Sequence, residues 1–213
     1  MFNTKETSLK VAEFLLQIKA IKLQPQKPFT WASGWNSPIY CDNRITLSYP
    51  TVRTYIRQRL AEVIHEEFSS ANLIAGVATA GIPQGVLVAQ ELGLPFAYVR
   101  SAPKDHGMNN MIEGEVKEGQ KVVVVEDLIS TGNSSLKAVE ALRAAGCEVI
   151  GMVSIFTYGF EVANQNFKNA NCKLISLSNY DDLIDQALES SCINPGEVEL
   201  LKSWRADPAN WAK

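Results

Sequence analysis

The sequence lacks the features that mark several protein classes. No apolar run approaches the ~18 residues that a membrane-spanning helix needs. The polar start, Met-Phe-Asn-Thr-Lys-Glu, does not read as a secretory signal. Basic residues are in the minority, with 20 Lys and Arg against 23 Asp and Glu and a net charge of -3, which argues against a general nucleic-acid-binding face. We therefore expect neither a membrane nor a nucleic acid as a partner.

Metal-binding and redox patterns are also missing. His65 and His106 are far apart in the chain, and none of the cysteines forms a CxxC pair. A structural zinc site or a redox dithiol is therefore disfavoured. We expect reduced thiols in a cytoplasmic protein. The four cysteines are Cys41, Cys147, Cys172 and Cys192.

The composition is that of a folded domain with its own core. Hydrophobic residues make up 46% of the 213 residues and charged residues 20%, whereas a disordered chain has far fewer hydrophobic residues. A chain of this length buries roughly 70% of its unfolded surface and needs no disulfide or metal for stability. We predict one domain over residues 1–213.

From residue 73 onward, short apolar runs alternate with helical patterns. The runs are apolar throughout instead of alternating with polar residues, which indicates a parallel sheet covered on both faces. This pattern predicts an α/β fold. We predict strands at 73–77, 96–99, 121–125, 149–156 and 173–177, and helices near 83–92 and 134–145.

The two ends of the chain depart from this alternation. Apolar spacing predicts one helix that includes Val11 and Ile21 and a second from Val52 to Ile64. The segment 29–47 reads as short strands and loops, with Trp31 and Tyr40 packed inside. We interpret residues 1–68 as an N-terminal hood with helices, 69–178 as the core and 179–213 as C-terminal helices. One of these helices begins at Asn194-Pro195-Gly196-Glu197, which combines an N-cap, a first-turn proline and an acid.

The most informative segment follows four consecutive valines. Glu126 and Asp127 come at the end of the predicted strand, and a hydroxyl-rich loop over 130–134 then opens a helix. A helix N-terminus with hydroxyl donors favours a phosphate, although neither GxxxxGK[ST] nor GxGxxG is present. The two acids would repel a lone phosphate, but they fit a phosphate joined to a polyol such as ribose. From composition alone, simple helix capping explains the segment about equally well.

A long polar stretch over 100–114 lies between two predicted strands. Its length without periodicity is typical of a lid over a site. Arg100, Lys104 and His106 are donors that could surround a departing diphosphate. On these residues alone, an ordinary solvated loop is the better interpretation.

Three segments together resemble one family. Residues 122–134 resemble the phosphoribosyl diphosphate signature of the type I phosphoribosyltransferases. KDHG followed by IEG at 104–114, and FxxxSGxxSPIYxDxR at 29–44, resemble the orotate phosphoribosyltransferases within it. The likeness extends over residues 9–213 and implies the type I phosphoribosyltransferase fold, a central parallel sheet flanked by helices with an N-terminal hood.

The resemblance implies a pentosyltransferase of pyrimidine (UMP) biosynthesis, which converts orotate and phosphoribosyl diphosphate to orotidine 5'-phosphate and diphosphate. It implies Mg2+ held mainly by substrate, with no metal-ligand set in the protein. The implied catalytic residues are Lys104, His106, Glu126 and Asp127. The implied phosphoribosyl diphosphate contacts are Thr79, Ala80, Gly81, Arg100, Lys104, His106, Glu126, Asp127, Leu128, Ile129, Ser130, Thr131, Gly132, Asn133 and Ser134.

The resemblance also implies a base site and a homodimer with shared active sites, because the 100–114 loop of such enzymes reaches into the neighbouring subunit. The implied orotate contacts are Lys27, Tyr40, Cys41, Arg44 and Ser130. The sequence departs from many members of the family. Ala80, Ser101 and Ala102 stand where others carry lysines, and 156–158 replaces a segment that often holds an arginine near orotate. Arg44 is a candidate substitute for that arginine.

Three alternatives stay open. A transferase of the same class could take a purine or uracil, although KDHG and SPIY argue against it. A DNA-binding sensor of phosphoribosyl diphosphate would need a basic domain, but residues 1–30 hold only five lysines and are too short for a winged helix. A degenerate paralogue without turnover is kept open by the absent lysines.

Overall fold

The computed structural model describes residues 4–31, 34–102 and 111–211. Its centre is a six-stranded sheet in the order β10-β9-β8-β5-β6-β7. The described pairs within it are parallel except β6 with β7, so the predicted α/β fold with a parallel sheet is confirmed. The strands are β5 (Leu73–Val77), β6 (Phe96–Val99), β7 (Ile112–Glu113), β8 (Lys121–Ile129), β9 (Glu148–Thr157) and β10 (Leu174–Asn179).

The central strand β8 explains why the sheet forms here. Its valines, residues 122–125, are all 0% exposed, and β-branched side chains suit a pleated surface buried on both sides. Each such burial stabilises the fold by about 1.5–3 kcal/mol. The strand extends four residues beyond its predicted end, to Ile129. Glu126 and Asp127 therefore lie within β8 and not after it.

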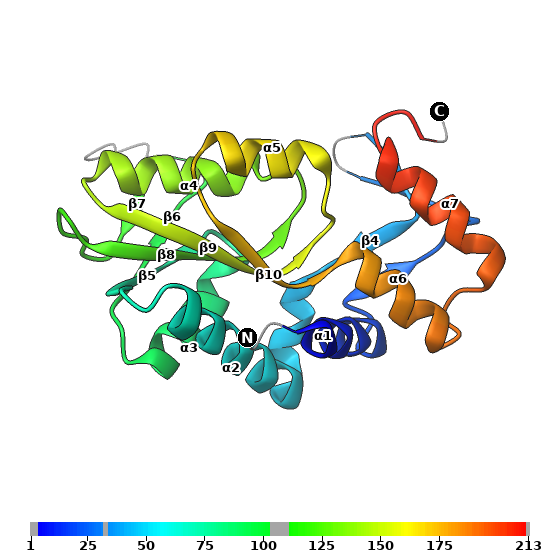
Figure 1. Cartoon of the computed structure of the whole chain (residues 1–213), viewed down its shortest axis with the longest axis horizontal. Coiled ribbons are helices and arrows are strands. Elements are labelled where there is room, and N and C mark those ends of the chain that lie inside the picture. The colour runs from blue at the N-terminus through cyan, green and yellow to red at the C-terminus, as the bar shows by residue number, and fades with distance from the viewer. Residues whose placement is uncertain (1–3, 32–33, 103–110, 212–213) are drawn as a thin grey trace.

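Helices cover both faces of the sheet, as Figure 1 shows. Because side chains alternate along a strand, Val123 and Val125 join one hydrophobic core and Val122 and Val124 join the other. The first core includes residues of α1 (Lys5–Gln17), α2 (Pro50–Glu67) and α3 (Gly81–Leu92). The second includes residues of α4 (Asn133–Ala144) and α5 (Glu161–Asn169).

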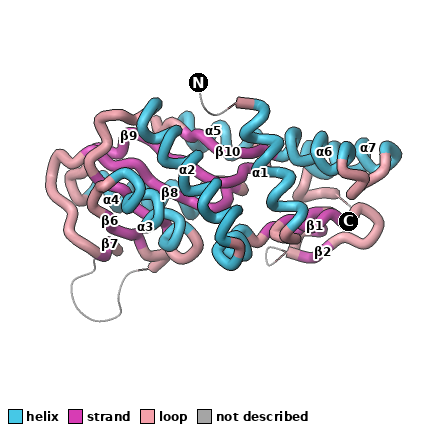
Figure 2. The backbone as a smooth tube through the Cα atoms, turned by 90° about the horizontal axis from the view of Figure 1, so that it is seen from below, coloured by secondary structure: helices cyan, strands magenta, loops and turns pink. Residues whose placement is uncertain are grey.

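The hood joins the two ends of the chain. Its strands pair antiparallel, β1 (Ile21–Leu23) with β4 (Ile39–Cys41) and β2 (Phe29–Thr30) with β3 (Asn36–Ser37). The 3-10 helix η1 (Asn43–Ser48) leads from the hood to α2. The C-terminal helices are α6 (Tyr180–Glu189) and α7 (Pro195–Ala206). In Figure 2 they lie beyond the end of the sheet, near β1 and β2.

One buried tryptophan packs where the C-terminal helices contact the hood. Trp204 of α7 is 0% exposed, and its Nε1 donates a hydrogen bond of 3.2 Å to the carbonyl of Asn36 in β3. The boundaries at 68 and 178 stay predictions. Packing runs across both of them, because α1 and α2 share the sheet's core and α7 packs on the N-terminal strands.

Several details differ from the predictions. The first helix ends at Gln17, Lys19 takes a positive φ of 57°, and Ile21 belongs to β1. Tyr40 was predicted to pack inside the hood, but it is 42% exposed. Helix α5 was not predicted, because only Ala163 and Phe167 of its residues are buried. Helix α7 does begin at Pro195 with a capping box, as predicted.

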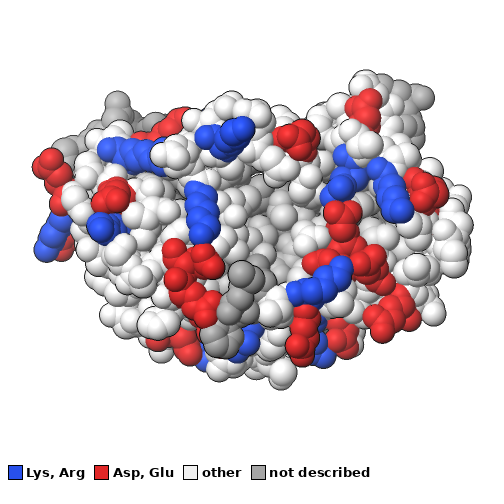
Figure 3. Space-filling view, in the orientation of Figure 1, with Lys and Arg blue, Asp and Glu red and all other residues white. Residues whose placement is uncertain are grey.

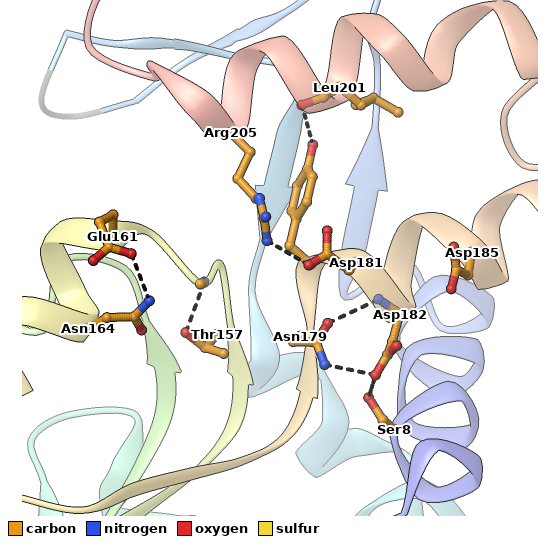
Figure 4. A network of polar contacts seen from close by, with 12 residues as sticks. Ser8, Thr157, Glu161, Asn164, Asn179, Asp181, Asp182, Asp185, Leu201 and Arg205 are labelled. Atoms are coloured by element: carbon orange, nitrogen blue, oxygen red, sulfur yellow. Dashed lines mark hydrogen bonds and ion pairs between the residues drawn. The ribbon is translucent and has the colours of Figure 1, made fainter.

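A buried carboxylate ties α1 to the C-terminal part of the sheet. Asp182, at the start of α6, is 7% exposed and accepts hydrogen bonds from Lys5, Ser8 and Asn179. Figure 4 shows the bonds from Ser8 and Asn179. Burial raises the pKa of this carboxyl, but the three donors outweigh burial and the net pKa is lowered.

Among the described helices, none is long and apolar enough to span a bilayer.

Candidate functional site

The acid pair lies where β8 approaches the carboxyl-terminal edge of the sheet, the edge at which open α/β sheets bind ligands. Glu126 is 6% exposed. One of its carboxylate oxygens accepts from Ser135 Oγ at 2.9 Å, and the other accepts from the Asp127 amide at 3.0 Å. Asp127 is only partly buried. The pair therefore presents one carboxylate held from behind and one that is open to a ligand.

Burial dominates the electrostatics of this pair. Burial, together with the neighbouring charge of Asp127, raises the pKa of Glu126 to about 8. Burial also raises the pKa of Asp127, although hydrogen bonds to its carboxylate oppose the shift. Two full negative charges are thus unfavourable here until hydrogen-bond donors or a cation arrive.

The predicted phosphate loop connects β8 to α4. Its Gly132 has φ 79°, a left-handed conformation, and a Cβ there would lie 2.6 Å from Cε2 of Phe167. Asn166 of α5 donates to the Thr131 carbonyl at 2.9 Å and to Asn133 Oδ1 at 3.0 Å. Ser134 is exposed at the helix N-terminus. The loop is thus braced from α5 at a helix N-terminus, a place where anions are favoured, and the predicted phosphate contacts stay predictions.

A second turn, after β5, reaches the same edge. Thr79 is exposed and Ala80 is half-buried. Gly81 opens α3 so close to β8 that a Cβ would lie 2.5 Å from the Val125 carbonyl. Only glycine lets the two elements approach this far. Gly81 therefore lies next to Glu126 of the acid pair, and the diphosphate contacts at 79–81 stay predictions.

Of the predicted lid over 100–114, the described residues are those at its two ends, and the lid stays a prediction. Arg100 is half-buried, its amide donates to the Met111 carbonyl at 2.8 Å, and its guanidinium lies 3.8 Å from Glu113. The two ends of the 100–114 segment therefore lie side by side. Lys104 and His106 lie outside the described residues.

A cavity of about 310 Å3 lies between the hood and the sheet edge. In Figure 3 the surface is hollowed between the sheet and the end that carries α6 and α7, and the hollow is mostly uncharged. None of the described residues lining the cavity carries a formal charge, and aromatic rings form much of its wall. The lining residues are Thr30, Trp31, Tyr40, Cys41, Leu128, Ser130 and Tyr158.

Asn43 joins this cavity to the acid pair. It is 0% exposed, and its Nδ2 donates to the Asp127 carbonyl at 2.7 Å. Its Oδ1 accepts from Cys41 Sγ at 3.3 Å. Burial raises the pKa of the Cys41 thiol, and the charges of Asp127 and Asp42 add to the shift. Cys41 is therefore a neutral wall of the cavity.

The predicted base contacts divide into two groups. Tyr40, Cys41 and Ser130 line the cavity. Lys27 and Arg44 are exposed and do not line it. The Arg44 guanidinium forms two hydrogen bonds with Asp42, at 2.7 and 2.9 Å.

Sequence reasoning missed four contributors. Trp31 was assigned only to packing, and Tyr158 only to a departure from the family pattern, yet both line the cavity. Asn43 stood unremarked inside the 29–44 motif, where only its position next to Arg44 could have drawn attention. Ser135, one residue beyond the predicted loop, holds Glu126. An additional hydroxyl at the helix start was the signal for it.

The side-chain atoms at the sheet edge that could bind a metal ion are mainly oxygens. Within the described ranges, no group of three or more His, Cys, Asp or Glu side chains gathers as a metal site. The acid pair and its neighbouring hydroxyls instead fit an Mg2+ ion that keeps most of its ligands from substrate and water, since Mg2+ dehydrates reluctantly.

Comparisons with known proteins agree with this geometry. The family model of the phosphoribosyl transferase domain matches residues 53–184. The chain is 62% identical over 200 residues to an orotate phosphoribosyltransferase of Phocaeicola vulgatus, covering 94% of each protein. The crystal structure of orotate phosphoribosyltransferase from Aeropyrum pernix is similar with a TM-score of 0.74 and 29% identity, covering 85% of this chain and 98% of that one. A Leishmania donovani UMP synthase is similar with a TM-score of 0.78 and 26% identity over 93% of this chain, which spans 42% of that longer protein.

Proposed function

Because the chain belongs to the phosphoribosyl transferase family and, within it, to the orotate phosphoribosyltransferases, we propose that it joins orotate to the phosphoribosyl group of phosphoribosyl diphosphate. The bond from C1 of ribose to the diphosphate oxygen breaks and a bond from C1 to orotate N1 forms, while the proton on N1 leaves with the diphosphate. The products are orotidine 5'-phosphate and diphosphate. One observation carries the proposal. The uncharged aromatic cavity is lined by Leu128 and Ser130, which closely follow the acid pair in the chain, so the cavity adjoins the acidic edge of the sheet.

The acid pair acts on the ribose. Asp127 and Glu126 accept hydrogen bonds from the 2'- and 3'-hydroxyls, which supply the donors that the buried carboxylates need. Their negative charge then faces the positive charge that develops at C1 in an oxocarbenium-like transition state. Ser135 and the Asp127 amide keep the Glu126 carboxylate oriented.

The two loops act on the phosphates. The 5'-phosphate accepts from the backbone and hydroxyls of 130–134, at the N-terminus of α4. The turn 79–81, Arg100, Lys104 and His106 take the departing diphosphate. Mg2+, when bound, offsets the charge on the diphosphate, and the carboxylate oxygens of the acid pair are the protein groups that would hold it beside the substrate.

The base occupies the cavity, with its N1 directed to the sheet edge. Tyr40, Cys41 and Ser130 are its predicted contacts, and Lys27 and Arg44 stay predicted contacts that approach from outside the lining. We place this chemistry in the cytoplasm, since four free thiols suit a reducing compartment.

The ultraviolet absorbance of orotate tests the reaction directly. Orotate should be lost on addition of phosphoribosyl diphosphate and Mg2+, whereas adenine, hypoxanthine and uracil should stay unchanged. Turnover of another base would move the protein to another substrate. No turnover together with retained phosphoribosyl diphosphate binding would favour the sensor or the degenerate paralogue.

The predicted homodimer with shared sites has its own test. Lys104→Ala and Asp127→Ala each inactivate a different part of the site. If the loop of one subunit serves the site of its partner, mixing the two inactive proteins restores one intact site per heterodimer. Absence of recovery despite verified subunit exchange would contradict the shared site.

A further inference from the structure

The side chain of Tyr158 is packed closely among other aromatic rings. It follows β9, and its amide donates to the Ile129 carbonyl of β8 at 3.1 Å. Its ring lies 5.3–5.7 Å, centroid to centroid, from the rings of four other aromatic residues, which fixes its direction. These residues are Trp31, Phe156, Phe160 and Trp204.

The hydroxyl of Tyr158 has no hydrogen bond to any part of the chain that the structure describes. The residue is only 2% exposed, yet its hydroxyl is not among the fully buried polar atoms without a partner, so the hydroxyl contributes to that small exposed surface. A buried polar group normally has a partner. Tyr180 shows the usual case, because its hydroxyl donates to the Leu201 carbonyl at 3.1 Å. The surface that Tyr158 does expose belongs to the cavity that also contains Cys41 and Ser130.

The form of the hydroxyl follows from its surroundings. Burial raises the pKa of Tyr158 well above its usual value, and the neighbouring groups Cys41, Tyr180, Asp127 and Tyr40 add to the shift. Cys41 and Tyr40 line the same cavity as Tyr158. The hydroxyl therefore stays protonated at neutral pH and is a donor available on the cavity side.

We propose that Tyr158 is a specificity-determining residue, whose hydroxyl donates a hydrogen bond to an acceptor oxygen of the planar base bound in this cavity. The inference rests on the proposed function and deepens it. The uncharged lining makes a neutral donor the means of recognition, and an orotate ring offers carbonyl and carboxylate oxygens as acceptors. A fixed donor left unpaired selects against bases that lack such an oxygen.

The test uses the full-length protein and two matched variants, each of which loses one buried hydroxyl. Tyr158→Phe keeps the ring among its aromatic neighbours. Tyr180→Phe is the control, because Tyr180 packs on the same Trp204 but does not line the cavity. We expect Tyr158→Phe to raise KM for orotate, and Kd for orotate in a direct titration, about tenfold. Its kcat and its KM for phosphoribosyl diphosphate should stay within about twofold, as for a loss of uniform binding.

The melting temperature, Tm, is the second measurement, and we expect it to differ between the two variants. Tyr158→Phe breaks no hydrogen bond to the described part of the chain, so its Tm should not fall. Tyr180→Phe breaks a hydrogen bond, so its Tm should fall while KM for orotate is unchanged. An orotate Kd of Tyr158→Phe within twofold of the wild type would overturn the inference, as would a Tm loss with equal changes in both KM values.

A third variant distinguishes recognition of the base by Tyr158 from recognition by the predicted cation, Arg44. Arg44→Ala should weaken orotate binding less than Tyr158→Phe does. If Arg44→Ala alone abolishes orotate binding, the base is recognised by the cation and the inference is wrong. Failure of the proposed function is distinguishable, because the wild-type protein would then neither bind nor consume orotate.

Discussion

The two halves of the candidate site are built in different ways. The sugar-phosphate half, residues 126–135, is one continuous stretch that begins in β8 and ends in the first turn of α4. The base half gathers residues from the hood, from the end of β8 and from the end of β9. A continuous stretch carries its chemistry in its order of residues, whereas the base half exists only after distant segments pack.

The halves also differ in what holds them. In the sugar-phosphate half, local backbone geometry and hydrogen bonds from Ser135 and Asn166 position the groups. In the base half, aromatic packing around Tyr158 and Trp204 forms the wall. Asn43 is the described side chain that bonds to both, through Cys41 and the Asp127 carbonyl. Damage to one half should therefore affect one substrate first, and damage to Asn43 should affect both.

The largest effect is expected at Asp127, the more open of the two acids proposed to bind the ribose. Asp127→Asn should lower kcat/KM by a factor on the order of 100 to 1,000, because it removes charge beside the developing cation. Initial rates with each substrate varied in turn measure this. Asp181→Asn, which changes an exposed acid paired with Arg205 at 2.8 Å, is the control. A loss below tenfold at Asp127 would place the charge stabilisation elsewhere.

Gly132→Ala should destabilise the turn between β8 and α4 in the sugar-phosphate half. The variant forces an alanine into φ 79° and against Phe167, at a cost of about 2–4 kcal/mol in the free energy of unfolding. Gly93→Ala is matched, since Gly93 has φ 65° but nothing within 4 Å of a Cβ, and it should cost about 1 kcal/mol. Urea denaturation compares the two. Equal costs would mean that contact with Phe167 does not matter.

Asn43→Ala should uncouple the halves. It leaves the Asp127 carbonyl without its side-chain donor, a loss of about 1–3 kcal/mol in the free energy of unfolding. KM should rise for both substrates, because the wall at Cys41 and the backbone of Asp127 lose their common anchor. Asn164→Ala removes an exposed amide bonded at 3.3 Å to Glu161 and serves as the control. A change confined to one substrate would contradict the coupling.

The smallest effect is a difference in pH dependence between two buried acids. The pKa of Glu126 is raised from 4.5 to about 8 on folding. Between these values the unfolded chain is ionised at this group and the folded chain is protonated, so stability falls as the pH rises. Glu126→Gln should flatten this limb and raise the free energy of unfolding near pH 8 by on the order of 1–2 kcal/mol.

The pKa of Asp182 is lowered from 3.8, which gives the opposite sign. Its contribution is complete above about pH 4 and is lost as the pH falls through the lower folded value. Asp182→Asn should flatten that acid limb and leave the limb near pH 8 unchanged. Thermal unfolding followed from pH 2.5 to pH 9 measures both limbs. A steeper slope near pH 8 in Glu126→Gln would reverse the assigned sign.

Local rules predicted the elements that carry a strong periodic or capping signal. The four valines predicted β8, and the pattern at 195 predicted the start of α7 with its capping box. Where two elements share one apolar pattern, these rules failed. Ile21 continues the spacing of the first helix, but the turn at Lys19 sends it into β1. Nothing in the local order of residues distinguishes these outcomes, because pairing with β4 decides them.

The same division holds for the site. The local order of residues is enough to predict the acid pair, the hydroxyl loop and the glycines of the turns, because neighbours on one strand and one helix start stay close in any fold. Two contacts depend on long-range packing instead: Tyr158 and Trp31 form one cavity with Cys41, and Asn43 binds the backbone of Asp127. Those contacts join residues up to 127 positions apart, and only the packing of the hood against the sheet edge brings them within reach.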